Sequence, residues 1–201
     1  MRVGSVVFST EQGIGILAKD FYDNGVVTDA VVLAHGRRPD HPEWYPNSAF
    51  VNNAMELNWN HESGVMQRFI DDIDVLLCFE TPFNWELINY CRNEGVPTAL
   101  MTMFECMPKQ LPAQPDLILC PSLLDQQYYP HGKFIPVPVN KPWKYRERAT
   151  TFIHNAGHGG LKGRNGTREL LDAMQYVKSD INLIVRYQSE SLLGFSDSRV
   201  K

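Results

Sequence analysis

Residues 155–174, NAGHGGLKGRNGTRELLDAM, combine five glycines with basic side chains, which are the residue types that hold phosphate groups. Glycine lets the backbone approach a phosphate closely and adopt a positive φ. The start of the helix that follows attracts anions through its unpaired N–H groups and its partial positive charge. Arg164 and Arg168 offer charge-assisted hydrogen bonds, and Lys162 offers a point charge. The stretch therefore predicts phosphate binding, and the alternative is a glycine turn with solvated basic residues.

The glycine-rich stretch lies between a predicted strand and a predicted amphipathic helix. TFIHNAG reads as the strand, and NLIVRYQ as a second strand after the helix. Leu170, Leu171, Met174 and Val177 fall on one face of the helix. We expect Thr167 or Asn165 to cap its start. The stretch carries neither the G-K-[ST] ending of a Walker A loop nor a G-x-G-x-x-G fingerprint directly after a strand.

This strand, loop and helix resemble the opening of the donor domain in retaining GT-B glycosyltransferases of the group-one kind. The matching positions are Arg164, Asn165, Gly166, Leu170, Leu171 and Ala173. The resemblance implies that a nucleotide-sugar diphosphate is held by Gly160, Lys162, Arg164, Gly166 and Arg168. The family has a lysine where this chain has Asn165, so the charge must come from the neighbouring basic residues. No metal and no cofactor are needed if these groups and the helix start neutralise the diphosphate.

The chain before this loop alternates short apolar runs with helical patterns. Strands are predicted at residues 3–9, 28–36, 74–80, 97–105, 116–122 and 133–139, and helices at 16–25, 64–73, 84–95 and 123–132. This order predicts a Rossmann-like parallel sheet of the α/β class. The strands are nearly continuous apolar runs, as expected where helices cover both faces. Residues 37–61, rich in proline and tryptophan, are expected to form one long irregular segment.

The organisation predicted from these elements has two domains. Residues 1–139 form an acceptor-side Rossmann-like domain, and the polar residues 140–150 form a linker. Residues 151–201 form the beginning (strand, helix, strand) of a second Rossmann-like domain that binds the nucleotide sugar. A unit of about 50 residues buries little apolar surface by itself. We therefore expect an incomplete donor domain in a longer GT-B protein, with the family's paired glutamates beyond Lys201.

Candidate acceptor-side residues follow the strands of the first domain. Ligands of open α/β sheets bind at the carboxyl ends of strands. Gly13 and Gly15 lie in the expected turn EQGIG, which the GT-B resemblance places at the cleft near donor phosphate and acceptor. Glu80 and Glu105 end two strands and can contact sugar hydroxyls, or each can cap the element that follows it. The sequence identifies no catalytic residue.

Composition excludes several classes of protein. With a net charge of −4 and no basic stripe, the chain is not expected to bind nucleic acid. No apolar run approaches the roughly 20 residues of a membrane helix. The four cysteines lack C-x-x-C spacing, which predicts free thiols and a reducing, cytoplasmic location. His154 and His158 have no third ligand nearby, so no metal site is expected. No G-x-S-x-G elbow supports a serine hydrolase.

The leading hypothesis is a glycosyltransferase that moves a sugar from a nucleotide-sugar donor to a carbohydrate or other hydroxyl acceptor. Two alternatives remain open. One is a non-catalytic α/β binding module or a truncated scaffold relative. The other is an NAD(P)-dependent oxidoreductase that uses the GIG at Gly13. The sequence lacks two features of a dinucleotide-binding site. The full G-x-G-x-x-G fingerprint is absent, and the second strand ends near His35 instead of near an acidic residue.

Overall fold

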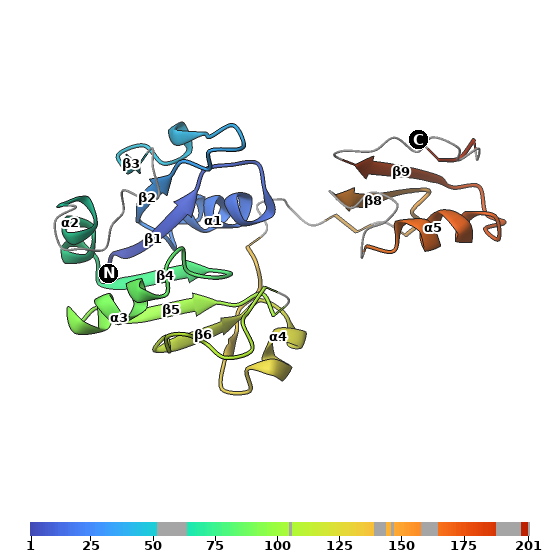
Figure 1. The fold of residues 1–201 in the computed structure, drawn as a ribbon. Helices are drawn as coiled ribbons and strands as arrows, with labels where there is room; N and C mark the ends of the chain where they lie inside the picture. Colours follow the sequence, from blue (N-terminus) through green and yellow to red (C-terminus); the bar gives the residue numbers. More distant parts are fainter. Residues whose placement is uncertain are drawn as a thin grey trace. The chain divides into compact units, whose positions relative to one another are not determined.

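The structure, a computed structural model, describes residues 1–51, 64–104, 106–138, 144–145, 147–157, 165–187 and 198–200 (Figure 1). The contacts within the chain divide it into two compact units, Met1–Lys141 and Pro142–Lys201. Four of the residues predicted from sequence to bind ligands lie outside the described residues. They are Gly160, Lys162 and Arg164 of the predicted phosphate loop, and Glu105.

Unit 1 is built on one parallel sheet with the strand order β3-β2-β1-β4-β5-β6-β7. Its strands are β1 (Val3–Phe8), β2 (Asp29–Leu33), β3 (Ala49–Val51), β4 (Val75–Phe79), β5 (Thr98–Met101), β6 (Leu117–Cys120) and β7 (Lys133–Phe134). Its helices are α1 (Gly13–Asp23), the short 3₁₀ helix η1 (Pro42–Trp44), α2 (Gly64–Asp72), α3 (Glu86–Asn93) and α4 (Leu123–Tyr128). The predicted α/β class is confirmed. The strand order reverses between β1 and β4, which makes their carboxyl ends a topological switch point.

Helices cover both faces of this sheet. Successive residues of a strand point to opposite faces, so each strand contributes side chains to a core on either side. Val32 of β2 packs in one core cluster with Phe21 of α1 and Phe79 of β4. Val31, the preceding residue, packs in a second cluster with residues of α2 and α3 such as Ile70. Burial on both faces explains why the strand sequences are apolar without alternation.

Three sequence expectations for unit 1 were wrong in detail. Residues 37–61 are not irregular throughout, because η1 and β3 form there, and β3 pairs in parallel with β2. Only three residues long and partly exposed, β3 gives no clear strand pattern. The expected turn EQGIG is largely helical, with Gly13 and Gly15 in the first turn of α1. The last strand is limited to Lys133–Phe134, since the prolines that follow remove backbone donors.

Unit 2 contains the predicted strand, helix and strand. These are β8 (Thr151–Gly157), α5 (Thr167–Met174) and β9 (Asn182–Tyr187), with β8 and β9 parallel. Leu171 and Met174 of α5 pack against Ala156 and Val185 of the strands, which confirms the predicted apolar face. Arg199 donates from its guanidinium to the carbonyl oxygens of Val177 and Met174, both at 2.7 Å. A cation at this position satisfies carbonyl groups at the end of α5.

Among the described residues, no helix combines the length and the apolar composition needed to cross a membrane.

Thiol labelling provides a first test of this fold. The four cysteines are thiols outside any disulfide, and Cys106 alone is exposed. Burial raises the pKa of Cys78 and of Cys91 to about 12. Because the thiolate is the reactive form, iodoacetamide at pH 8 is expected to modify Cys106 roughly a thousandfold faster than Cys78 or Cys91. Mass spectrometry of timed digests measures these rates. Equal rates for Cys91 and Cys106 in the folded protein would contradict the packing described.

Candidate functional site

The carboxyl ends of β1, β2 and β4 enclose a cavity of about 320 Å³ at the switch point. Its polar lining comes from Gln12, His35, Glu80 and Thr81. Its apolar lining comes from Val6, Val7, Phe8, Ile14, Ala18, Leu33, Phe79, Pro82 and Phe83. An apolar cavity with a few converging polar groups, at the switch point of a parallel sheet, is the usual form of a small-molecule site.

The close approach of α1 to β1 determines one side of this cavity. A Cβ atom on Gly15 would lie 2.1 Å from the carbonyl oxygen of Thr10 and 3.0 Å from that of Phe8. Only glycine therefore allows the helix to begin so near the strand end. Gly13 differs, because a Cβ atom there would meet nothing within 4 Å. Of the two glycines predicted at this site, Gly15 is therefore required for packing, whereas position 13 tolerates a side chain. Neither glycine lines the cavity itself, but the neighbouring Gln12 and Ile14 do.

His35, just after β2, is held in the cavity wall from several sides. Its ring packs edge-on against Phe8, with 5.4 Å between the ring centroids. Its backbone N–H donates to the Asp40 carboxylate at 3.0 Å, and its Nε2 lies 3.3 Å from Nε2 of Gln12. Nδ1 is buried and has no hydrogen-bond partner among the described residues. The side-chain amide of Gln12 can donate to Nε2 of His35 only when the ring proton of His35 is on Nδ1. The tautomer of His35 and the orientation of the Gln12 amide are therefore set together.

Glu80 directly follows β4 and has an unusual backbone conformation. Its φ is +58°, in the left-handed region. For a residue other than glycine this region costs about 1–2 kcal/mol. The Glu80 N–H donates to the carbonyl oxygen of Met101 at 2.9 Å, which extends the ladder between β4 and β5 into the strained residue. Non-glycine residues in strained conformations concentrate at functional sites, where the surrounding structure holds them. The side chain so placed lines the cavity.

Asp125 is a buried carboxylate that the sequence reasoning missed. It accepts hydrogen bonds from the Thr102 hydroxyl at 3.1 Å and from the Phe104 N–H at 2.9 Å. Ser122 donates its hydroxyl to the same carboxylate, and its oxygen accepts from the Asp125 N–H at 3.1 Å. This network fixes the segment after β5 to the start of α4. The S-x-x-D spacing at 122–125 matches a capping box and is the signal that could have revealed it.

The predicted phosphate loop is described at its junction with α5. Gly166, with a φ of +66°, occupies the position before the helix, and Arg168 is exposed in the first turn. The expected caps were wrong. Thr167 is buried, with its hydroxyl 2.8 Å from Nε2 of His154, and the Asn165 amide donates to the carbonyl oxygen of Ala156 at 2.9 Å. Both side chains bind to β8 instead of α5, and glycine at the capping position brings no side-chain acceptor to the first-turn N–H groups.

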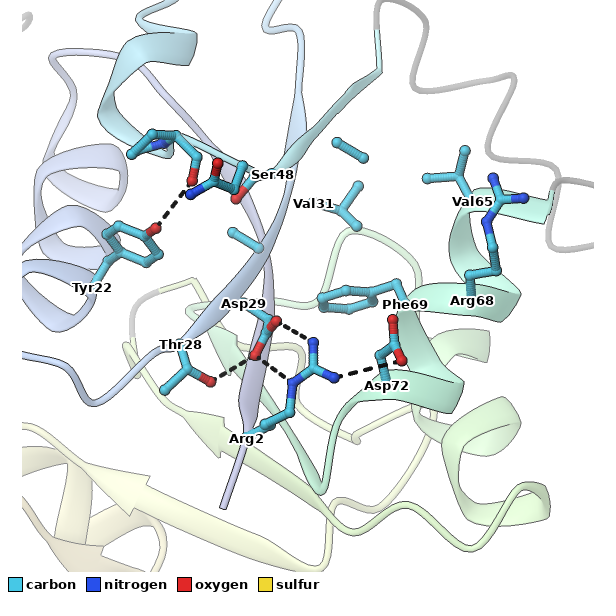
Figure 2. Close-up of a pocket in the computed structure, with 14 residues that line it drawn as sticks. Arg2, Tyr22, Thr28, Asp29, Val31, Ser48, Val65, Arg68, Phe69 and Asp72 are labelled. Atoms are coloured by element: carbon cyan, nitrogen blue, oxygen red, sulfur yellow. Dashed lines mark hydrogen bonds and ion pairs between the residues drawn. The ribbon is translucent and has the colours of Figure 1, made fainter.

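A second cavity, of about 350 Å³, lies at the amino end of β2 and is lined also by residues of α2 (Figure 2). There Arg2 donates to both carboxylate oxygens of Asp29, at 2.6 and 3.2 Å, and lies 3.5 Å from Asp72 (Figure 2). The hydrogen bonds from Arg2 lower the pKa of Asp29. Although this cavity is slightly larger, it lies at the opposite ends of the strands from those where parallel sheets bind ligands. We interpret its ion pairs as a structural link between β1, β2 and α2.

No group of three or more potential metal-ligating side chains (His, Cys, Asp or Glu) comes together in the part of the chain that the structure describes.

The fold of this chain is similar to the folds of two solved structures of other proteins. MurG from Acinetobacter baumannii aligns with a TM-score of 0.51 and 11% identity, over 94% of this chain and 61% of that one. MnaA from S. aureus, solved with UDP, aligns with a TM-score of 0.51 and 12% identity, over 100% of this chain and 68% of that one. The chain has the Rossmann-like α/β fold of GT-B proteins.

The GT-B likeness is one of fold alone, since the sequences are so different. A third structure, the glycotransferase of kitacinnamycin, aligns with a TM-score of 0.49 and 8% identity, over 100% of this chain and 70% of that one. In sequence, no protein-family model and no curated protein matches the chain. The chain spans about 61% of the length of the GT-B protein MurG.

Proposed function

We propose that the protein is a glycosyltransferase that moves a sugar from a nucleotide-sugar donor to a hydroxyl acceptor. The observation that carries the proposal is the GT-B fold with a ligand-sized cavity at the switch point of its first sheet. A glycine-rich and basic sequence also precedes α5. That MnaA was solved with UDP supports a nucleoside diphosphate as a ligand of this fold.

The donor diphosphate is assigned to the loop and to the start of α5. Gly160 and Gly166 allow close approach of the backbone, and Lys162, Arg164 and Arg168 supply positive charge. The first-turn N–H groups of α5 add the partial charge of the helix end. Together these groups neutralise the leaving diphosphate, which is the main electrostatic requirement of the reaction.

The acceptor is assigned to the cavity in unit 1. Glu80 lines it, Gly15 sets the position of α1 beside it, and Glu105 follows the neighbouring β5 in sequence. Gly13 lies in the first turn of α1, next to the lining residues Gln12 and Ile14.

Substitution of Arg164 by alanine tests the donor assignment. Loss of a charge-assisted hydrogen bond is expected to weaken UDP binding by about 1.5–3 kcal/mol, roughly 10- to 150-fold in Kd. Isothermal titration calorimetry with UDP measures the change. Lys178→Ala is the matched control, because Lys178 is exposed beyond the other end of α5 and should leave the affinity unchanged. An Arg164→Ala protein that binds UDP like the wild type would exclude this role for the loop.

A further inference from the structure

We propose that the cavity at the amino end of β2 is a second ligand site, which binds a small organic carboxylate with an apolar body and a terminal hydroxyl group. Arg68 of α2 binds the carboxylate, and Ser48, just before β3, binds the hydroxyl group. The site lies at the opposite ends of the strands from the switch-point cavity, and the proposal does not depend on the proposed glycosyl transfer.

Arg68 lines this cavity and has no partner, unlike the other arginine of the lining. Arg2 donates to both carboxylate oxygens of Asp29 and lies 3.5 Å from Asp72. Arg68 is exposed and has neither a hydrogen bond nor an ion pair in the described part of the chain. Asp72 lies four residues further along α2, a spacing at which opposite charges can pair, but its carboxylate lies near Arg2. The Arg68 guanidinium is therefore available to an anionic ligand.

The guanidinium of Arg68 lies over the first turn of α2. Three of its atoms are 3.5 to 3.9 Å from the place where a Cβ atom of Gly64 would stand. Figure 2 shows the Arg68 side chain directed away from Asp29 and Asp72. Because a helix start carries partial positive charge, a cation is unfavourable there unless an anion lies beside it. A ligand carboxylate supplies that anion, and its two oxygens match the planar fork of the guanidinium.

The apolar body and the hydroxyl group are inferred from the rest of the lining. Figure 2 shows Ser48 and Arg68 on opposite sides of the cavity, with Val31 between them. The Ser48 hydroxyl has no hydrogen bond to any residue that the structure describes, so it can donate to a ligand or accept from one. Apolar ligand surface gains from burial against the apolar lining residues, which are Ala30, Val31, Ala49, Val65 and Phe69.

The charge of the lining favours a ligand with a single negative charge. Arg2 is already paired with Asp29 and Asp72, which leaves Arg68 as the cation that can neutralise a ligand. One unpaired cation matches the charge of one carboxylate. A phosphate dianion in the same place would keep an uncompensated charge in a cavity that already contains two aspartates, and such a charge is costly to remove from water.

Four small probes that differ in one group test the proposal without any nucleotide. The first is 3-(4-hydroxyphenyl)propionate, and its amide removes the charge. The third, 3-phenylpropionate, removes the hydroxyl group, and 2-(4-hydroxyphenyl)ethyl phosphate replaces the carboxylate by a phosphate. Titrations followed in two-dimensional ¹H–¹⁵N NMR spectra give both the dissociation constants and the place of binding. The proteins are the wild type, Arg68→Gln and Ser48→Ala, with Arg37→Gln as the control because Arg37 is also exposed and lines neither cavity.

We expect the wild type to bind the hydroxylated acid about tenfold or more tightly than its amide, and more tightly than the phosphate. Arg68→Gln should bind the acid and the amide alike, and Ser48→Ala should weaken only the probes that carry the hydroxyl group. The backbone signals of Ala49 and Val65 should shift on binding, whereas that of Gln12 at the switch-point cavity should not. Without ligand, Arg68→Gln should melt at the wild-type temperature or above it, because a cation is removed from a helix start.

Several results would overturn the proposal. In the wild type they are no binding of the hydroxylated acid, equal affinity for the acid and its amide, equal affinity for 3-phenylpropionate, tighter binding of the phosphate, or shifts confined to the switch-point cavity. An acid affinity of Arg68→Gln within about twofold of the wild type, or a similar loss in Arg37→Gln, would also exclude the role of Arg68. If ligand-free Arg68→Gln melts clearly below the wild type, Arg68 stabilises the fold and is not held in reserve for a ligand.

Discussion

Replacing Gly15 by alanine is expected to lower the free energy of unfolding by about 3 kcal/mol or more, the upper range for overpacking. The added Cβ atom would lie 2.1 Å from the carbonyl oxygen of Thr10 and 3.0 Å from that of Phe8. Both neighbours are backbone atoms at the end of a central strand, so the helix itself must move. Its displacement would also distort the cavity wall that Gln12 and Ile14 form. Urea denaturation followed by circular dichroism measures the stability.

Gly13→Ala is the matched control for this substitution. Gly13 lies in the same turn of α1, and a Cβ atom there meets nothing within 4 Å. Alanine also has the higher helix propensity, so stability should stay the same or rise by up to about 1 kcal/mol. If Gly15→Ala proves as stable as Gly13→Ala, the close approach of α1 to β1 is not correctly described.

The second large effect is expected for Asp125→Ala. This carboxylate is 4% exposed and accepts from the Thr102 hydroxyl and the Phe104 N–H. Its removal leaves the Phe104 N–H without its partner, and an unsatisfied buried group costs about 1–3 kcal/mol. The Thr102 hydroxyl keeps only its longer bond to the carbonyl oxygen of Leu119, at 3.3 Å, and the bond from the Ser122 hydroxyl is lost as well. We expect a total loss of about 3–5 kcal/mol in the free energy of unfolding, again measured in urea.

Ser122→Ala separates the helix-capping part of this effect from the rest. Ser122 caps α4 through the Asp125 N–H, and loss of such a cap costs about 1 kcal/mol. Asp125→Ala should therefore be clearly the more destabilising of the two. An equal loss of stability in the two variants would mean that the hydrogen bonds from Thr102 and Phe104 to Asp125 do not stabilise the fold. In amide exchange, Phe104 should lose protection in Asp125→Ala and keep it in Ser122→Ala.

The fold could be predicted from sequence where the signal is local and strong. The apolar run that ends at Phe79 is β4, and the helical spacing of Leu171 and Met174 is the buried face of α5. β3 was missed because three partly exposed residues at a sheet edge carry almost no pattern. Its pairing with β2 is a long-range interaction that the local sequence does not encode.

The site was predicted less completely, because its geometry depends on residues that are distant in the sequence. Glu80 was found from its place at a strand end, but its positive φ follows from how β4 and β5 pair beyond it. Gly15 was selected as a turn residue, whereas its actual constraint is the carbonyl oxygen of Thr10. Asn165 and Thr167 have suitable side chains for capping α5, but β8 offers them competing partners.

Nucleotide-sugar binding is tested most directly by the thermal stability of the wild-type chain with a panel of nucleotides. The panel contains UDP and other nucleoside diphosphates, nucleotide sugars, NAD and NADP. A ligand at about 100 times its Kd stabilises the folded protein by roughly 2.7 kcal/mol. We predict that at least one nucleoside diphosphate and its nucleotide sugars raise the melting temperature, while NAD and NADP leave it unchanged. A rise with NAD or NADP alone, or no rise with any nucleoside diphosphate at millimolar concentration, would contradict the proposed function.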